Sequence, residues 1–169
     1  LHKDWKGTQV DQLFEEKTGN DYSIVNDADA AGLAEISFGA GKNKPGVVVM
    51  ITLGTGIGSG VFLDGKLLPN TELGHVLYKD GKSFEKYASD SARKRDGLSR
   101  KEWGKRLHKY FSHLQLILSP DLIIIGGGAS KKLDKYSSYI KINTPIVPAE
   151  AENEAGIIGA AMAANFHIK

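Results

Sequence analysis

The sequence predicts a layered α/β domain, because three observations agree on this architecture. Segments with helical periodicity alternate along the chain with short apolar segments of strand-like composition. Two of the apolar segments, Val47–Leu53 and Leu122–Ile125, have the composition of buried strands. Each of these two leads directly into a cluster of glycines. The 169 residues are enough for one domain with a hydrophobic core.

Composition and charge exclude several classes of protein. Hydrophobic residues make up 41% and charged residues 25%, which is ordinary for a soluble globular protein. The net charge of +2 is too small to favour binding to nucleic acid or to an anionic membrane. Cysteine is absent, which excludes disulfides and thiolate metal sites. No apolar stretch is long enough to span a bilayer and no signal peptide is visible, so we expect a cytoplasmic protein.

The part of the chain before the first buried strand predicts two helices and a short strand. The expected ranges are an amphipathic helix over Val10–Lys17, a strand over Tyr22–Val25, and a small-residue helix from Asn26 or Asp27 to Ile36 or Phe38. Gly19 is a suitable end for the first helix, and Asn26 or Asp27 can cap the second. A loop rich in glycine and lysine, Gly39–Gly46, follows.

The glycine-rich turn after Val47–Leu53 is the strongest local signal. Glycines alternate with other residues from Gly54 to Gly60, and a second strand, Gly60–Leu63, ends at the hairpin dipeptide Asp64-Gly65. Glycine allows backbone N–H groups to converge on an anion. The alternative is a tight hairpin without a ligand. No Gly-Lys-Ser/Thr follows, which argues against a Walker motif, and a strand rather than a helix follows, which argues against a dinucleotide fingerprint.

The second half of the sequence continues the alternation of helices and strands. The expected elements are a helix over Phe84–Lys94 with Ser83 as its cap, a helix over Ser99–Leu118, a strand over Leu122–Ile125, a helix over Ala129–Tyr139, an extended segment over Ile140–Val147, and a buried final helix over Glu154–Asn165. Aromatic and aliphatic side chains in Ser99–Leu118 recur every three or four residues, which indicates one buried face.

Polar residues near the ends of these elements are candidates for a site. Asn26 and Asp27 are at a strand-to-helix junction, where Asp27 is either a helix cap or a general base. Glu72 and His75 form either a surface pair or a clamp for vicinal hydroxyls. Glu85 could extend this set or be an ordinary exposed glutamate. A metal site is disfavoured, since only one histidine is nearby.

Gly126, Gly127 and Gly128 follow the second buried strand. They could open a helix N-terminus toward an anion or bring the backbone close to a nucleotide. A flexible link between strand and helix is the alternative. Local sequence does not decide between the two.

Together, the motifs NDADAAG, LGTGIGSG, PNTELGH and SPDLIIIGGGAS resemble the ROK family of sugar kinases, which belongs to the actin-like ATPase superfamily. The resemblance covers about Val25 to Ala164. PNTELGH, LSRKEW and TPIVPAE look most like the polyphosphate glucokinase branch. The resemblance implies an actin-like ATPase (ribonuclease H-like) domain, with a mixed sheet flanked by helices.

The resemblance also implies roles for individual residues. Asp27 would be the catalytic base that acts on the 6-hydroxyl of glucose. The residues implied to hold the sugar are Asn26, Glu72, His75 and Glu85. The residues implied to bind phosphate are Gly54, Thr55, Gly56 and Gly58. Gly126, Gly127 and Gly128 would line the groove of the nucleotide or polyphosphate donor, which acts with Mg²⁺.

Two departures from the family pattern affect the interpretation. The cysteine-rich zinc motif of many members is absent from this chain, and the polyphosphate glucokinase branch lacks it as well. The first phosphate motif is also absent, and the chain starts at Leu1 without a methionine. We therefore expect residues 1–25 to end a connecting region after a missing N-terminal lobe, and residues 26–169 to be the C-terminal lobe. Such a fragment alone would be inactive.

The expected function is a glucokinase that uses polyphosphate or ATP, and we expect the protein to form a homodimer. Two alternatives are a kinase for another hexose and the non-catalytic sugar-binding domain of a ROK-type transcriptional regulator. Lys42, Lys44, Lys79 and Lys82 could line a path for a long polyanion, although scattered lysines are usually only solvated.

Overall fold

A five-stranded mixed sheet forms the centre of the protein in the computed structural model, which describes residues 3–151 and 154–164. The strands are β1 (Val47–Leu53), β2 (Ile57–Leu63), β3 (Lys66–Leu68), β4 (Leu122–Gly126) and β5 (Ile146–Pro148). Their order is β3-β2-β1-β4-β5. β1 is antiparallel to β2 and parallel to β4, so the sheet changes from antiparallel to parallel at its central strand.

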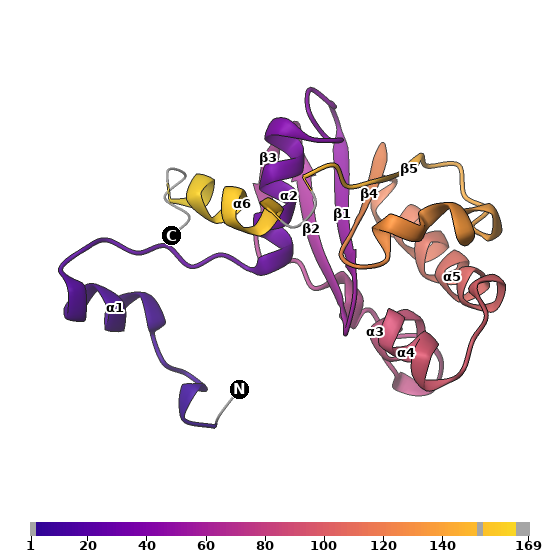
Figure 1. Cartoon of the computed structure of the whole chain (residues 1–169), viewed down its shortest axis with the longest axis horizontal. Coiled ribbons are helices and arrows are strands. Elements are labelled where there is room, and N and C mark those ends of the chain that lie inside the picture. The colour runs from indigo at the N-terminus through magenta and orange to yellow at the C-terminus, as the bar shows by residue number, and fades with distance from the viewer. Residues whose placement is uncertain (1–2, 152–153, 165–169) are drawn as a thin grey trace.

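Helix α2 (Asp27–Phe38) lies against one face of the sheet, and α6 (Ala155–Ala163) packs against α2 on this side (Figure 1). Leu33 of α2 packs there against Met50 and Phe62 of the sheet. Glu35 is fully buried, and its two carboxylate oxygens accept hydrogen bonds from the backbone N–H groups of Ala40, Glu150 and Ala151. This carboxylate therefore ties α2 to the segment that leads into α6.

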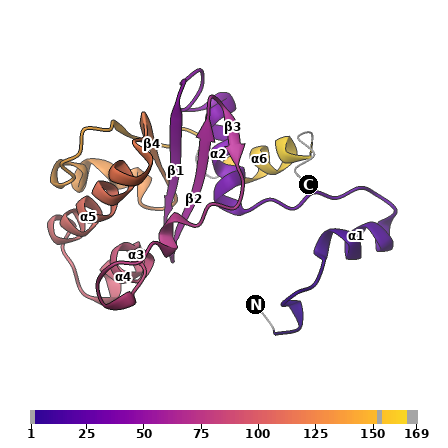
Figure 2. The same ribbon diagram turned by 180° about the vertical axis from the view of Figure 1, so that it is seen from behind.

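The opposite face carries α3 (Phe84–Ala88), α4 (Asp90–Arg95) and α5 (Arg100–Leu118), as the two opposite views show (Figures 1 and 2). The buried stripe predicted for α5 is confirmed: Trp103, Leu107 and Phe111 are fully buried. Ser99 caps α5, and its side chain and that of Glu102 form a capping box. The larger hydrophobic core lies between this helix and the sheet.

Several sequence predictions differ from the structure. Tyr22–Val25 is not a strand, and the Tyr22 N–H bonds to the side chain of Glu15 rather than to a neighbouring strand. The helix predicted over Phe84–Lys94 is divided into α3 and α4, because Ser89 is extended and caps α4. β2 begins at Ile57 rather than at Gly60, whereas the Asp64-Gly65 turn is confirmed by φ angles of 49° and 77°.

The C-terminal part holds further corrections. The predicted helix over Ala129–Tyr139 is two 3₁₀ helices, Ser130–Lys135 and Ser137–Tyr139. Of the extended segment Ile140–Val147, only the end pairs as β5. The final helix is not wholly buried, since Ile157 is 76% exposed. Its predicted last residue, Asn165, lies outside the described residues.

The N-terminal segment stands apart from the sheet and its helices (Figure 2). Helix α1 (Val10–Thr18) begins at the predicted residue and ends one residue later than expected, at Thr18, where the left-handed residue Gly19 caps it. It contains no buried residue. Among the helices of the described residues, none is both long and apolar enough to cross a membrane.

Candidate functional site

Asn26 and Asp27 lie at the N-terminus of α2. Asn26 is the N-cap, and its side-chain oxygen accepts a hydrogen bond of 2.8 Å from the N–H of Ala28. The amide nitrogen of Asn26 donates to Glu72 Oε1 at 3.5 Å. The helix cap and the contact with Glu72 therefore use different atoms of the Asn26 side chain. Asp27, the first residue of the helix, is exposed.

Glu72 and His75 lie together on a short loop after β3. Glu72 Oε2 is 3.9 Å from His75 Nδ1, and both side chains are exposed. Ser59, buried in β2, holds this loop: its hydroxyl donates to the carbonyl of Thr71 at 2.6 Å and accepts from the N–H of Leu73 at 2.9 Å. The structure thus brings Asn26 next to Glu72, which is 46 residues away in sequence, and Glu72 in turn lies near His75.

Asp29 is a residue of this site that the sequence did not reveal. Its side chain is 1% exposed, and one oxygen accepts a 2.9 Å hydrogen bond from the N–H of Asn70. The other oxygen, Oδ1, is buried with no hydrogen-bond partner among the described residues. Burial raises the pKa of Asp29; the Asn70 hydrogen bond opposes this rise, and the charges of Glu72 and Asp27 add to it. Asp29 thus links α2 to the loop that carries Glu72.

Replacing Asp29 by asparagine should make the stability of the protein less dependent on pH. The folded-state pKa of Asp29 is raised above 3.8, so on raising the pH the unfolded chain loses this proton first. Wild type therefore loses stability relative to Asp29→Asn as the pH rises from below 3.8 through the folded-state pKa. Urea unfolding of both proteins across acid to neutral pH measures this difference. A constant difference at every pH would contradict the prediction.

The glycine-rich turn is shorter than its sequence suggested. Gly54, Thr55 and Gly56 form the turn between β1 and β2, whereas Gly58 lies within β2 and pairs with Thr52. The role proposed for Gly58 in phosphate binding stays a prediction.

Glu85, on α3, meets this turn. Its Oε2 accepts a hydrogen bond of 3.1 Å from the N–H of Ile57. The carboxylate is half-buried and supports the base of the turn, while its second oxygen makes no recorded hydrogen bond to the described residues. A contact between this second oxygen and a sugar stays a prediction.

The two glycine clusters, which are far apart in sequence, meet in space. Gly54, Thr55 and Gly128 line one pocket of ≈ 290 Å³, which we call the glycine pocket. Gly128 also lines a smaller neighbouring pocket of ≈ 130 Å³, together with Gly126 and Gly127. The parallel pairing of β1 with β4 causes this meeting, because both strands end at the same edge of the sheet.

Gly127 explains why glycine is needed at the end of β4. Its φ angle is +72°, and a Cβ there would be 3.0 Å from the carbonyl oxygen of Leu53. A larger residue would be strained and would also push β4 away from β1. Glycine at position 127 is therefore required by close backbone approach, independently of any ligand.

Basic side chains complete the glycine pocket, and no pattern in the sequence predicted them. They are Arg93, Lys94, Arg100 and Lys132. Asp90 lies among them: Arg93 Nε is 2.7 Å and Lys94 Nζ 3.0 Å from its carboxylate oxygens. Burial tends to raise the pKa of Asp90, but the hydrogen bonds from Arg93 and Lys94 hold it below its usual value. The pocket thus joins backbone turns with an excess of positive charge, the environment that phosphate groups favour.

Comparisons with known proteins agree on one family. The sequence profile of the ROK family matches residues 1–92. A polyphosphate glucokinase of Mycobacterium tuberculosis (strain CDC 1551 / Oshkosh) is 47% identical over 164 residues, which cover 96% of this chain and 62% of that protein. The chain therefore spans less than two thirds of this relative's length.

Solved structures extend this result to the fold. The inorganic polyphosphate/ATP-glucomannokinase from Arthrobacter sp. strain KM is 50% identical, with a TM-score of 0.90 over 99% of this chain and 66% of that one. A ROK family glucokinase from Streptomyces griseus, solved with glucose and AMPPNP, is 22% identical, with a TM-score of 0.77 over 94% of this chain and 73% of that one. The expected actin-like ATPase fold is confirmed.

Proposed function

The chain belongs to the ROK family, and from this premise we propose that it is the C-terminal lobe of a glucokinase. In this proposal residues 26–169 are the lobe and residues 1–25 end the connection from an N-terminal lobe. The intact enzyme would transfer a phosphoryl group from polyphosphate or ATP to the 6-hydroxyl of glucose. The similarity to the mycobacterial polyphosphate glucokinase and to the Arthrobacter glucomannokinase supports this substrate class.

The observation that carries the proposal is the convergence of Asn26 and Asp27 with Glu72. A carboxylate at a helix N-terminus, next to an amide and a second carboxylate, suits a sugar whose hydroxyls must be held in one orientation. Glu72, His75 and the amide of Asn26 would hold the hydroxyls. Asp27 would accept the proton of the 6-hydroxyl as its oxygen attacks phosphorus, because phosphoryl transfer requires mainly positioning, charge neutralisation and a base.

The phosphoryl donor would lie in the glycine pocket, with its terminal phosphate at the Gly54–Gly56 turn. Backbone N–H groups and the basic side chains of α4 would stabilise charge on the phosphoryl oxygens. Mg²⁺, bound to the donor, would supply further neutralisation of that charge. Within the described residues, no three His, Cys, Asp or Glu side chains are grouped to hold a metal by themselves, so most ligands of the ion would be phosphate oxygens and water.

Two other functions make different predictions. A ROK-type transcriptional regulator would bind sugar through the same residues but would have no use for a donor site. The basic glycine pocket favours the kinase over the regulator, because a sugar sensor does not require positive charge at the turn. A kinase for another hexose differs only in sugar preference, since Glu72 and His75 can bind hydroxyls that several hexoses share.

The experiment is an assay of glucose 6-phosphate formation by the complete protein with saturating glucose, comparing polyphosphate with ATP. We expect turnover with at least one donor and the highest kcat/KM with glucose among glucose, mannose, fructose and N-acetylglucosamine. Size measurement in solution would test the expected homodimer. Sugar binding without product from either donor would contradict the kinase and favour the regulator.

A further inference from the structure

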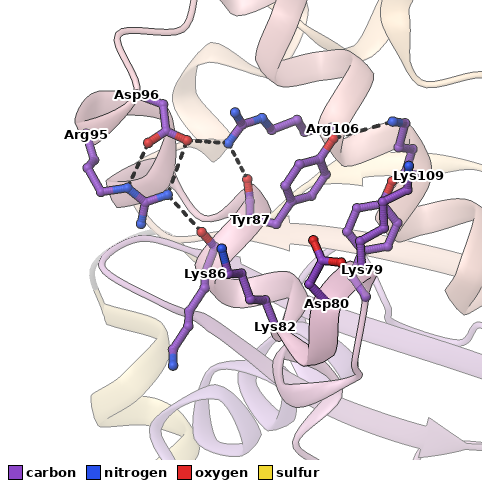
Figure 3. Close-up of a pocket in the computed structure, with 10 residues that line it drawn as sticks. Lys79, Asp80, Lys82, Lys86, Tyr87, Arg95, Asp96, Arg106 and Lys109 are labelled. Carbon is purple, nitrogen blue, oxygen red and sulfur yellow. Dashed lines mark hydrogen bonds and ion pairs between the residues drawn. The ribbon is translucent and has the colours of Figure 1, made fainter.

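A second basic pocket, which shares no lining residue with the glycine pocket, lies beside α3 (Figure 3). Its volume is ≈ 310 Å³, and its walls come from the segment Tyr78–Lys82, α3, the end of α4 and α5. We call it the lysine pocket. Helix α3 contributes to both regions, since Glu85 contacts the base of the glycine turn while the next two residues, Lys86 and Tyr87, line the lysine pocket.

The lysine pocket concentrates positive charge. Its cations are Lys79, Lys82, Lys86, Arg95, Arg106 and Lys109, and its acids are Asp80 and Asp96. Six cations against two carboxylates leave four positive charges in excess. The whole chain has a net charge of only +2, so the remainder is net negative. A charge excess gathered in one concave place differs from scattered solvated lysines.

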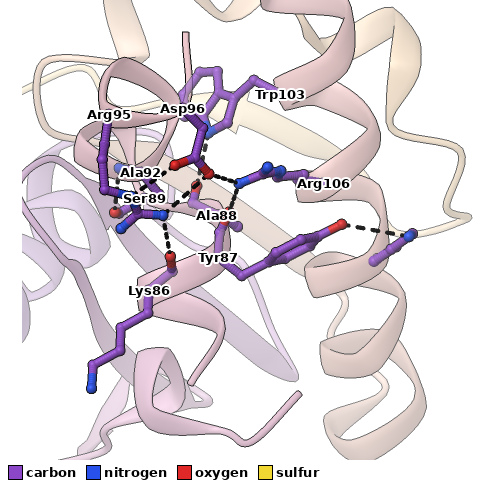
Figure 4. Close-up of polar contacts among 10 residues, drawn as sticks. Lys86, Tyr87, Ala88, Ser89, Ala92, Arg95, Asp96, Trp103 and Arg106 are labelled. Carbon is purple, nitrogen blue, oxygen red and sulfur yellow. Dashed lines mark hydrogen bonds and ion pairs between the residues drawn. The ribbon is translucent and has the colours of Figure 1, made fainter. Parts of the chain in front are cut away.

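The two arginines of the lysine pocket are held in fixed positions (Figure 4). Asp96 accepts hydrogen bonds of 2.7 Å from Arg95 Nε and 2.6 Å from Arg106 Nη1. The same guanidinium groups donate to the carbonyl oxygens of Lys86 and Tyr87. These two hydrogen bonds to Asp96 lower its pKa to about 2, so the carboxylate stays ionised and offsets part of the arginines' charge.

Most of the unbalanced charge therefore belongs to the lysines. Within the described residues, the ammonium groups of Lys79, Lys82 and Lys86 form no ion pair or hydrogen bond, and all three residues are exposed. Lys109 lies 5.9 Å from the ring centroids of both Tyr78 and Tyr87. Lysine binds phosphate as a mobile point charge, without the paired geometry that arginine requires. Such a group suits a flexible chain of phosphates better than one rigid ligand.

Helix α4 connects this pocket with the glycine pocket. Lys94 lines the glycine pocket, and the next residue, Arg95, lines the lysine pocket. Positive side chains thus continue from the proposed donor site around α4 and α3. We propose that the lysine pocket binds the distal phosphates of a linear polyphosphate whose terminal phosphoryl group lies at the glycine turn. This inference rests on the proposed function, and it assigns to polyphosphate a pocket separate from the glycine pocket, which should not contribute to the binding of ATP.

The test compares two triple variants of the complete protein with equal loss of charge. The pocket variant is Lys79→Gln, Lys82→Gln and Lys86→Gln. The control is Lys17→Gln, Lys66→Gln and Lys141→Gln, three lysines that are also exposed but line neither the lysine pocket nor the glycine pocket. Measurements are the Kd of long-chain polyphosphate by fluorescence anisotropy, its salt dependence, and KM for long-chain polyphosphate, ATP and glucose.

We expect the pocket variant to bind long-chain polyphosphate about tenfold or more weakly, with a salt slope reduced by about 2, as for three lost contacts to a flexible polyanion. Its KM for polyphosphate should rise in parallel, while KM for ATP and glucose stays unchanged. The control should change Kd by less than about twofold, because its lysines face solvent elsewhere. Equal losses in both variants, an equal rise of KM for ATP, or no measurable binding of polyphosphate by wild type would overturn the lysine pocket.

Failure of the kinase proposal has a different signature. If no donor yields glucose 6-phosphate but the pocket variant alone loses polyphosphate binding, the lysine pocket stands and the catalytic assignment falls. If glucose 6-phosphate forms from polyphosphate with the same KM in both variants and wild type, the kinase stands and the lysine pocket falls.

Discussion

Asp27→Asn in the complete protein is expected to lower kcat by about 10²–10⁴, the usual contribution of a general base, while the Kd of glucose stays nearly constant. Asparagine is almost isosteric with aspartate but cannot accept the proton of the 6-hydroxyl. It also preserves the start of α2, because the side chain that accepts the capping hydrogen bond from the Ala28 N–H belongs to Asn26 rather than to Asp27. Steady-state kinetics and glucose titration by calorimetry measure the two quantities.

Asp21→Asn is a suitable control. Asp21 is an exposed acid in the coil before α2, and its replacement by asparagine removes the same charge. It should leave both kcat and glucose affinity unchanged. Turnover of Asp27→Asn within about tenfold of wild type would show that Asp27 is not the base. A parallel loss of glucose affinity would instead make Asp27 a sugar-binding residue.

Gly159→Ala should destabilise the protein by about 3 kcal/mol, at the upper end of the range for overpacked cores. A Cβ at Gly159 in α6 would overlap the backbone carbonyl group of Ala30 in α2. A backbone carbonyl cannot rotate away as a side chain can, so the two helices must separate. Separation would expose the small apolar residues between them, including Ala30, Ala155 and Ala163, all nearly fully buried. Urea unfolding measures the free-energy difference.

Gly156→Ala on the same helix is the matched control. A Cβ at Gly156 meets no atom within 4 Å. The same substitution should therefore stabilise the protein by up to about 1 kcal/mol through helix propensity. Equal effects of the two substitutions would mean that helix propensity, rather than contact with α2, decides the outcome at Gly159.

The sequence predicted the elements whose signals are local. The apolar strands β1 and β4, the capped helix α5 and the start of α2 at Asn26 follow from periodicity and caps, which depend on neighbouring residues. The division of α3 from α4 involves, besides the cap Ser89, a contact from another helix: the indole N–H of Trp103 donates to the carbonyl of Ala88 at 2.8 Å. No local pattern announces this contact.

A similar cause explains the 3₁₀ helices after β4. The buried Tyr136 packs against Trp103, with ring centroids 4.6 Å apart, and its hydroxyl donates to the carbonyl of Ala129. These tertiary contacts bend a segment that locally resembles a helix. The sequence predicts an extended segment over Ile140–Val147. In the structure the side-chain oxygen of Gln115 accepts hydrogen bonds from the N–H groups of Asn143 and Thr144, which a longer strand would use for pairing with its neighbour.

The candidate site divides in the same way. Asn26, Glu72 and His75 were identified from the sequence, and the structure places them together. Asp29 and Ser59 were missed, because an acid in a small-residue helix and a serine between glycines have no distinctive pattern. Their importance comes from burial and from hydrogen bonds to a loop that follows β3.

The mixed order of the sheet also has a consequence for folding kinetics. β1, β2 and β3 are successive hairpin strands, and closing such short loops is fast, about 1–10 μs for a hairpin. β4 joins β1 only across a long interval, with the carboxylate of Asp121 bonded to the N–H of Val47, 74 residues away in sequence. Long-range parallel pairing is slower, because loop closure must precede its contacts. The Gly54–Gly56 turn would thus form early, and the glycine pocket, whose other wall follows β4, would be completed late.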